Sequence, residues 1–167
     1  ATPYRLGHGY IFGQYCKTPW ANWFDKLSYT IGITRLQEES FLSPYHYMIS
    51  DGDIQRDLDN LVSSEFGDYR VDQLEKVVIR QQHLHSAVKT LLSHAADRKG
   101  IVIFCVSIPH AEMLRDELLK AGLTSASVHS EMTIAERDHA LKSFDAGELR
   151  ILTNVNVLTE GWDSPRA

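Results

Sequence analysis

The sequence lacks the features that mark several common classes of protein. No apolar run reaches the roughly 18 residues that a membrane-spanning helix needs, so we predict no membrane span. The opening Ala-Thr-Pro-Tyr-Arg has neither the charged nor the apolar region of a signal peptide, so we expect none. The two cysteines, Cys16 and Cys105, are too few for a disulfide framework, and Cys105 lies in an apolar run, which is typical of a buried thiol. These features favour a reduced, cytoplasmic setting.

The chain also lacks an excess of positive charge. Its 17 lysines and arginines are outnumbered by 22 aspartates and glutamates, which gives a formal net charge of −5. This balance argues against a protein that binds nucleic acid through a strongly basic surface. The histidines do not show metal-site spacing either: His83 and His85 would not share a helix face, and His8 and Cys16 have no partner pair nearby. We therefore predict no metal site.

The residues after position 100 show a regular alternation of strand and helix patterns. The apolar run 101–106 predicts a strand that is covered on both faces, and shorter strands are predicted at 125–129 and 150–154. Helix patterns separate these strands, so the order is β-α-β-α-β. This order predicts a parallel, right-handed α/β sheet.

Residues that are typical of helix starts and helix ends support the same alternation of strands and helices. Pro109 suits the first turn of a helix that Gly122 ends. The Thr133–Glu136 stretch has the form of a capping box and opens a second helix, which Gly147 ends. The apolar residues that should face the sheet are Ala111, Leu114, Leu118 and Ala121 in the first helix, and Ile134, Leu141 and Phe144 in the second.

The first hundred residues are less regular. Three-four spacing of apolar residues predicts a helix over 53–66 and a longer one over 72–97, with Asp72 as the N-cap of the longer one. Weaker patterns predict a short helix from Trp20 to Leu27 and strands from Tyr29 to Ile33 and from Tyr45 to Ile49.

Polar residues follow all three strands of the predicted sheet. They are Ser107, His129 and the pair Thr153 and Asn154. The carboxyl ends of parallel strands meet at one edge, where helix N-termini also offer free N–H groups to phosphates. Such an edge could hold a phosphodiester backbone without a basic surface. The alternative for any one of these residues is a strand end that simply meets water.

A second polar cluster, Thr159–Asp163, follows the last strand. Gly161 permits a tight turn or the close approach of a ligand. Asp163 precedes Ser164 and Pro165, so it is either a turn residue or a carboxylate that accepts a hydrogen bond from a ribose hydroxyl.

Four segments, in this order, resemble motifs of superfamily 2 helicases of the DEAD/DEAH type. Ala1–Arg5 resembles the end of motif III, and Ile101–Ser107 resembles motif IV. The segment between motifs IV and V is resembled by Val128–Ser130 together with Glu136, Arg137 and Phe144. Ile151–Pro165 resembles motif V. The opening seven residues and the Lys99–Phe104 entry most resemble the bacterial RadD (YejH) branch, which is implicated in DNA repair; type I and type III restriction subunits are the nearest rivals.

The resemblance implies an arrangement of domains. Residues 71–167 would form a RecA-like (P-loop NTPase-type) second helicase domain, incomplete and truncated before motif VI. Residues 1–70 would hold the end of the first RecA-like domain and an irregular α+β connecting region.

The resemblance also implies roles for single residues. Thr2 would couple the ATP state to the grip on nucleic acid, and Gly161 and Asp163 would approach ATP. The residues that would face the nucleic-acid backbone are Ser107, His129, Thr153 and Asn154. Arg137 is expected in a surface salt bridge, and Trp162 departs from the expected aliphatic residue or Phe, either as core filling or as a changed fit beside the nucleotide.

Several motifs of an ATP site are missing from this sequence. It has no Gly-x-x-x-x-Gly-Lys-Ser/Thr loop, no acidic pair for magnesium and no arginine-rich motif VI. We therefore expect a fragment that does not hydrolyse ATP alone, from an ATP-dependent DNA or RNA helicase or translocase. ATP and Mg²⁺ would be held mainly by parts absent from this chain, and its partners would be nucleic acid, DNA rather than RNA, and the first RecA-like domain. The alternatives are a non-catalytic α/β module that binds nucleic acid or protein, and the motor subunit of a type I or type III restriction system.

Overall fold

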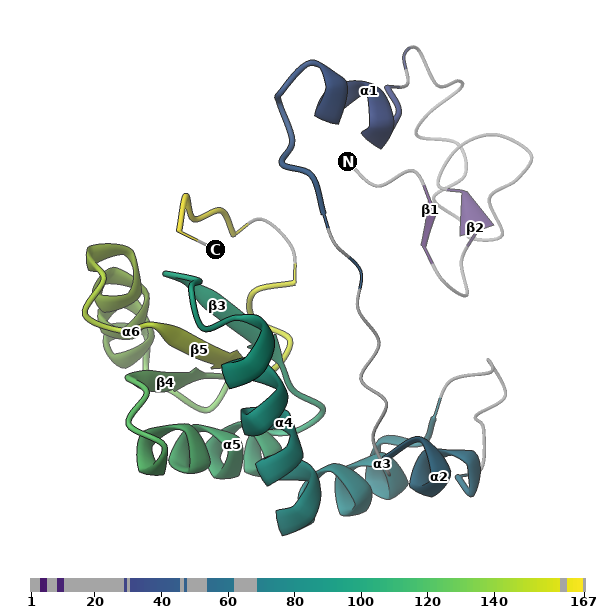
Figure 1. Ribbon diagram of the computed structural model, residues 1–167, viewed down its shortest axis with the longest axis vertical. Helices are drawn as coiled ribbons and strands as arrows, with labels where there is room; N and C mark the ends of the chain where they lie inside the picture. The colour runs from purple at the N-terminus through teal and green to yellow at the C-terminus, as the bar shows by residue number, and fades with distance from the viewer. Residues whose placement is uncertain are drawn as a thin grey trace. The chain divides into compact units, whose positions relative to one another are not determined.

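The computed structural model describes residues 4–5, 9–10, 29, 31–45, 47, 54–61, 69–159 and 162–166 (Figure 1). The contacts divide the chain into two compact units, Ala1–Ile49 and Ser50–Ala167. The domain boundary predicted between residues 70 and 71 stays a prediction.

In the first unit, strand β1 (Tyr4–Arg5) pairs antiparallel with β2 (Gly9–Tyr10), and one helix follows, α1 (Ile33–Glu38). The strand predicted from Tyr29 to Ile33 is wrong, because Ile33 begins α1. The helix is short and exposed, and an ion pair of 2.7 Å between Arg35 and Glu39 supports it locally. The short helix predicted over residues 20–27 lies outside the described residues. Of the strand predicted over 45–49, the structure describes residues 45 and 47, and neither is in a strand.

The second unit contains a three-stranded parallel sheet. Its strands are β3 (Ile101–Phe104), β4 (Ser125–Val128) and β5 (Ile151–Asn154), in the order β3-β5-β4 (Figure 1). Asn154 at the end of β5 lies opposite Phe104 on one side and Val128 on the other, so the three strands end in register. The predicted parallel α/β fold is confirmed.

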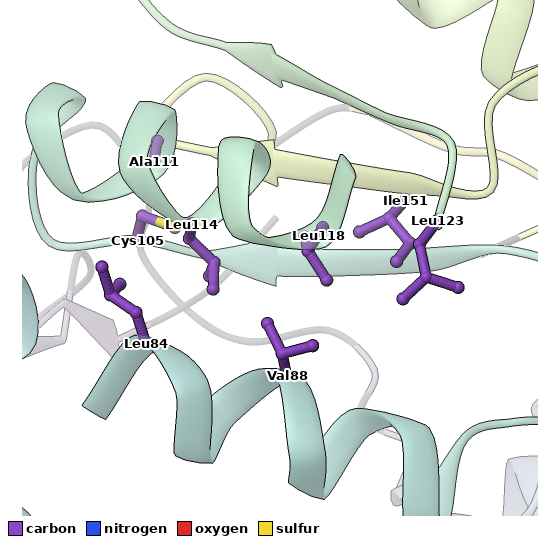
Figure 2. Packing of buried hydrophobic residues seen from close by; sticks show 8 residues of the cluster. All are labelled: Leu84, Val88, Cys105, Ala111, Leu114, Leu118, Leu123 and Ile151. Carbon is purple, nitrogen blue, oxygen red and sulfur yellow. The ribbon is translucent and has the colours of Figure 1, made fainter. Parts of the chain in front are cut away.

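Helices cover both faces of this sheet. Because side chains alternate along a strand, Ile151 and Leu152 of β5 point to opposite faces. Ile151 packs with residues of α4 (Gln81–His94) and α5 (Ile108–Lys120), whereas Leu152 packs with residues of α6 (Ile134–Ala146). Figure 2 shows the first cluster, with Leu84 and Val88 of α4 pointing toward α5 and the sheet. Among the described helices, none combines the length and apolar character that crossing a bilayer requires.

The helix boundaries predicted after residue 100 are confirmed. Ser107 caps α5, with Pro109 in the first turn. The capping box of α6 is complete, and α6 ends at Gly147, which has a left-handed φ of 86°. Two residues predicted to be buried are exposed: Ile134 is the first residue of α6 and 74% exposed, and Ala121 follows the last turn of α5.

The single helix predicted over 72–97 is wrong, since the chain forms α3 (Val71–Val78) and then α4. Arg80 lies between them in an extended conformation with a ψ of 134°. The break is accompanied by a contact with α2 (Ile54–Asp59): Arg80 Nη1 and His83 Nε2 lie 2.6 and 2.8 Å from the Asp57 carboxylate. This ion-pair cluster holds the pKa of Asp57 below its ordinary value, chiefly through the His83 hydrogen bond.

The start of α3 and the extent of α2 also differ from the predictions. Arg70, not Asp72, is the N-cap of α3, and Asp72 lies in the first turn, where its charge favours the helix dipole. The described helix α2 is shorter than the predicted 53–66, and residues 62–68 lie outside the described part.

A buried carboxylate joins α4 to α5. Glu117 of α5 is only 8% exposed, and it accepts from Lys120 Nζ at 2.6 Å and faces His85 Nε2 of α4 at 2.9 Å. The hydrogen bond from Lys120, followed by one from Gln81, holds the pKa of Glu117 at about 2, below its ordinary value of 4.5. The folded state therefore favours the charged form.

We predict that Glu117→Gln reduces the acid sensitivity of the fold. Because folding lowers the pKa of Glu117, its contribution to the free energy of unfolding is complete above pH 4.5 and is lost as the pH falls toward about 2. Urea unfolding across this range should give a shallower loss of stability for Glu117→Gln than for the unmodified chain. The control is Glu131→Gln, at an exposed carboxylate, which should keep the original slope. Equal slopes for all three proteins would contradict this role.

Candidate nucleic-acid and nucleotide sites

The structure brings four of the predicted site residues to one edge of the sheet. Ser107 follows β3, His129 follows β4, and Thr153 and Asn154 end β5. Because the three strands end in register, these residues share the carboxyl edge. Their side chains nevertheless have different surroundings.

Ser107 is half-buried and caps α5. Its Oγ accepts from the backbone N–H of His110 at 3.3 Å. His110 Nδ1 in turn accepts from the backbone N–H of Val106 at 3.3 Å, and burial lowers the pKa of His110. A neutral His110 therefore fixes the turn between β3 and α5. The sequence analysis missed this residue, although its position three residues after a cap serine is a usable signal.

His129 carries an open hydrogen-bonding atom. The residue is 8% exposed, and its Nε2 lies 3.7 Å from Glu112 Oε1 of α5. Its Nδ1 is buried and has no hydrogen-bond partner within the described part of the chain. Buried polar atoms nearly always have a partner, so an unpaired one indicates a missing partner, which a water, an ion or a ligand can supply.

Thr153 is fully buried, and its hydroxyl is used inside the domain. Thr153 Oγ1 donates toward the carbonyl of Ala111 at 3.1 Å and lies 3.0 Å from Ser127 Oγ. A direct contact with a nucleic-acid backbone would require this hydroxyl to leave both partners. The geometry instead makes Thr153 a link between β5, β4 and the first turn of α5.

Asn154 shapes the loop that follows β5. Its Oδ1 accepts from the backbone N–H groups of Val157 and Leu158, each at 3.0 Å. The chain from 155 to 159 is a series of bends rather than a helix. Asn154 Nδ2 is buried without a partner among the described residues, so it is a second open donor at this edge.

Arg137 of α6 provides a third open donor. Its Nε is buried and unpaired, and the expected surface salt bridge is absent from the described part of the chain. Arg137 lies about one helical turn before Ala140 and Leu141, which pack against the sheet. Its side chain therefore emerges from the sheet-facing side of α6.

Asp163 lies at the opposite edge of the sheet. Its neighbour Ser164 donates to Asp145 Oδ1 at the end of α6 at 2.7 Å, and Arg166 Nη2 donates to the carbonyl of Lys99, just before β3, at 2.7 Å. Asp163 itself is exposed. The structure thus separates Asp163 from the four polar residues at the carboxyl edge. Gly161, which is also expected near ATP, and Thr2, which is expected to couple the ATP state to the grip on nucleic acid, lie outside the described residues.

Trp162 fills the core beside α6. Its ring lies 6.1 Å from the ring of Phe144 at an interplanar angle of 50°, and it packs against the cluster around Leu152. Of the two interpretations that the sequence left open, core filling agrees with this packing.

The described part of the chain contains neither a metal-binding cluster nor a reactive thiol. Within it, no group of three or more His, Cys, Asp or Glu residues is placed to hold a metal ion. Cys105 is a free, buried thiol, as predicted, and burial raises its pKa to about 12. A thiol with this pKa is a poor nucleophile at neutral pH.

Residues 82–167 match the model of the helicase conserved C-terminal domain family. The chain belongs to this family. The ATP-dependent RNA helicase DBP8 of Meyerozyma guilliermondii is 33% identical over 87 residues, which are 52% of this chain and 19% of that protein. The protein IRC3 of Saccharomyces cerevisiae is 26% identical over 143 residues, 84% of this chain and 20% of that protein. This chain therefore spans about a fifth of the length of these relatives.

Among solved structures, Saccharomyces cerevisiae Dbp5 bound to RNA and ADP BeF3 is 27% identical, with a TM-score of 0.44 over 48% of this chain and 21% of that one. The helicase Lhr of Mycobacterium smegmatis, bound to ssDNA and AMP-PNP, is 15% identical, with a TM-score of 0.46 over 53% of this chain and 13% of that one. The family match identifies residues 82–167 as C-terminal domain sequence of a superfamily 2 helicase.

We predict that Thr153→Val destabilises this helicase domain. The substitution keeps the shape of the side chain but removes the hydrogen bonds of Thr153 Oγ1 to the Ala111 carbonyl and to Ser127 Oγ, which leaves only the longer, 3.4 Å bond from Ser127 Oγ to that carbonyl. The expected loss in the free energy of unfolding is about 1–2 kcal/mol. Thr159→Val is the matched control, because Thr159 is exposed, and a surface change of this kind costs less than about 0.5 kcal/mol. Urea unfolding measures both, and a neutral Thr153→Val would contradict the linking role.

Proposed function

We propose that the chain is part of the second RecA-like domain of an ATP-dependent helicase or translocase and that it binds two ligands at opposite edges of one sheet. The observation that carries this proposal is the set of buried, unpaired hydrogen-bonding atoms at the carboxyl edge, His129 Nδ1 and Asn154 Nδ2, in a chain of the helicase family. Unsatisfied polar atoms destabilise a fold by about 1–3 kcal/mol each, and a ligand or an ordered water at this edge would complete them. Arg166 Nε, at the opposite edge, is also buried without a partner among the described residues.

The carboxyl edge suits a phosphodiester backbone. The N-termini of α5 and α6 both lie there and present backbone N–H groups and the positive ends of helix dipoles. Ser107 and His129 add side-chain groups, and Thr153 supports them from within. This mode of binding grips the backbone rather than reading bases, so it is compatible with a net charge of −5.

The opposite edge suits the ribose of ATP. Asp163 presents an exposed carboxylate between two anchored neighbours, and a carboxylate can accept hydrogen bonds from ribose hydroxyls. Gly161 would let the nucleotide approach the backbone. The triphosphate and Mg²⁺ would be held by the first RecA-like domain, which neutralises the phosphate charge, and Thr2 would transmit that state to the nucleic-acid grip.

We propose DNA as the nucleic acid and a RadD-like branch of the helicases as the context of this chain. The support is the resemblance of residues 1–7 and 99–104 to that branch. A free, buried Cys105 is compatible with a reducing, cytoplasmic setting. RNA is the alternative, since DBP8 is named an RNA helicase.

We predict that variants at the two edges separate two activities of the complete protein. Asp163→Ala should raise the KM for ATP about tenfold, through the loss of a charged acceptor, and leave the Kd for single-stranded DNA unchanged. His129→Phe keeps an aromatic side chain but removes both ring nitrogens, Nδ1 among them, so it should weaken DNA binding about three- to tenfold and leave the KM for ATP unchanged.

Fluorescence anisotropy with single-stranded DNA and RNA of equal length, together with steady-state ATP turnover, measures these effects. Asp138→Ala, at an exposed carboxylate of α6, is the control and should change neither. Equal effects of Asp163→Ala and His129→Phe on both measurements would contradict the two-edge assignment. Tighter binding to RNA than to DNA would contradict the choice of DNA.

A further inference from the structure

The segment Trp162–Arg166 is fastened to the rest of the domain at three points, and we call it the clasp. Trp162 packs against Phe144. Ser164 donates to Asp145, and its Oγ also accepts from the backbone N–H of Arg166 at 3.3 Å. These contacts hold the residues on both sides of Asp163 against the C-terminal turn of α6.

Arg166 makes the third and most extensive attachment. Its guanidinium lies 5.8 Å from the centre of the Phe144 ring, and Nη2 donates to the Lys99 carbonyl at 2.7 Å. A cation over an aromatic ring is attracted by the ring quadrupole, and partial burial strengthens that attraction. Phe144 is itself fully buried, so Arg166 rests on a rigid surface.

Two glycines provide the space that Arg166 occupies. A Cβ atom on Gly100 would collide with the backbone carbonyl of Arg166, and a Cβ atom on Gly147 would collide with its guanidinium. Gly147 is also required by its left-handed φ of 86°, but Gly100 has no such conformational need. Contact with the clasp is therefore the reason in this structure for glycine at position 100.

We infer that Arg166, Ser164 and Phe144 are positioning residues that set the place of the Asp163 carboxylate. Asp163 makes no hydrogen bond of its own within the described part of the chain, so its position depends on the two attached neighbours. The inference rests on the proposed role of Asp163 toward ribose. It adds that the nucleotide edge is aligned by the end of α6 and the entry to β3.

The test uses the complete protein and two measurements. The first is hydrogen exchange in peptides that contain residues 162–166. The second is the ratio of kcat/KM for ATP to that for 2′-deoxyATP and for 3′-deoxyATP, which reports recognition of the ribose hydroxyls. The variants are Gly100→Ala, which displaces the clasp without removing a side chain, and Arg166→Ala. Gly32→Ala is the matched control, because nothing lies within 4 Å of a Cβ atom there.

Gly100→Ala and Arg166→Ala should both increase exchange in the clasp and lower the preference for ATP by at least about threefold, toward the value for Asp163→Ala. Arg166→Lys keeps a cation over Phe144 but loses the planar fork, so it should fall between Arg166→Ala and the unmodified protein. Gly32→Ala should change neither measurement.

Two results would overturn the inference. The first is that hydrogen exchange in residues 162–166 is unchanged in Gly100→Ala and Arg166→Ala. The second is that exchange is faster in these variants but their preference for ATP is unchanged, although Asp163→Ala abolishes that preference. If Asp163→Ala leaves the preference intact, the ribose role itself fails. In that case hydrogen exchange in the peptides around Asp163 is the deciding measurement. Faster exchange in Gly100→Ala and Arg166→Ala supports the positioning role, and unchanged exchange overturns it.

Discussion

The burial of β5 on both faces and both edges is the constraint on which the rest of the domain depends. All four of its residues are fully buried, and β3 and β4 flank it. A polar side chain in such a strand must find its partner inside the domain, because an unpaired buried polar group costs about 1–3 kcal/mol. Thr153 meets this requirement with α5 and β4, and Asn154 meets most of it with the loop that follows. The central strand β5 therefore forms the buried middle of the carboxyl edge, and β3 and β4 form its two sides.

Helix α6 relates the two edges to each other. It begins at the capping box of Thr133 beside the carboxyl edge and ends at Gly147 beside the clasp. Its 13 residues span about 20 Å at about 1.5 Å each, which exceeds the length of the four-residue strands, about 13 Å. Arg137 near its start and Asp145 near its end are thus held on one rigid element, so a ligand at one edge and the segment at the other share a common support.

Local signals in the sequence predicted much of this fold. Pro109 in the first turn of α5, the capping box and Gly147 each act over a few residues, and each is found as expected. The apolar run at 101–106 forms a shorter strand, Ile101–Phe104, at the edge of the sheet, and Phe104 is 62% exposed, so the predicted cover on both faces is incomplete. The break at Arg80 could not be predicted, because its contacts depend on Asp57, more than 20 residues earlier in the chain. Ile134 was misjudged because apolar periodicity does not show where the first turn of a helix leaves the sheet.

The candidate site was predictable in its position but not in the orientation of its side chains. Polar residues at three strand ends indicated the carboxyl edge, yet their spacing could not show that Thr153 turns inward while His129 keeps an open Nδ1. The separation of Asp163 from that edge depends on Asp145 and Lys99, distant residues that no motif names. Hydrogen exchange of the complete protein, with single-stranded DNA alone and with AMP-PNP alone, tests the two-edge arrangement most directly. DNA should protect peptides containing Ser107 and His129, and the nucleotide should protect residues 162–166; protection of the same peptides by both ligands would contradict it.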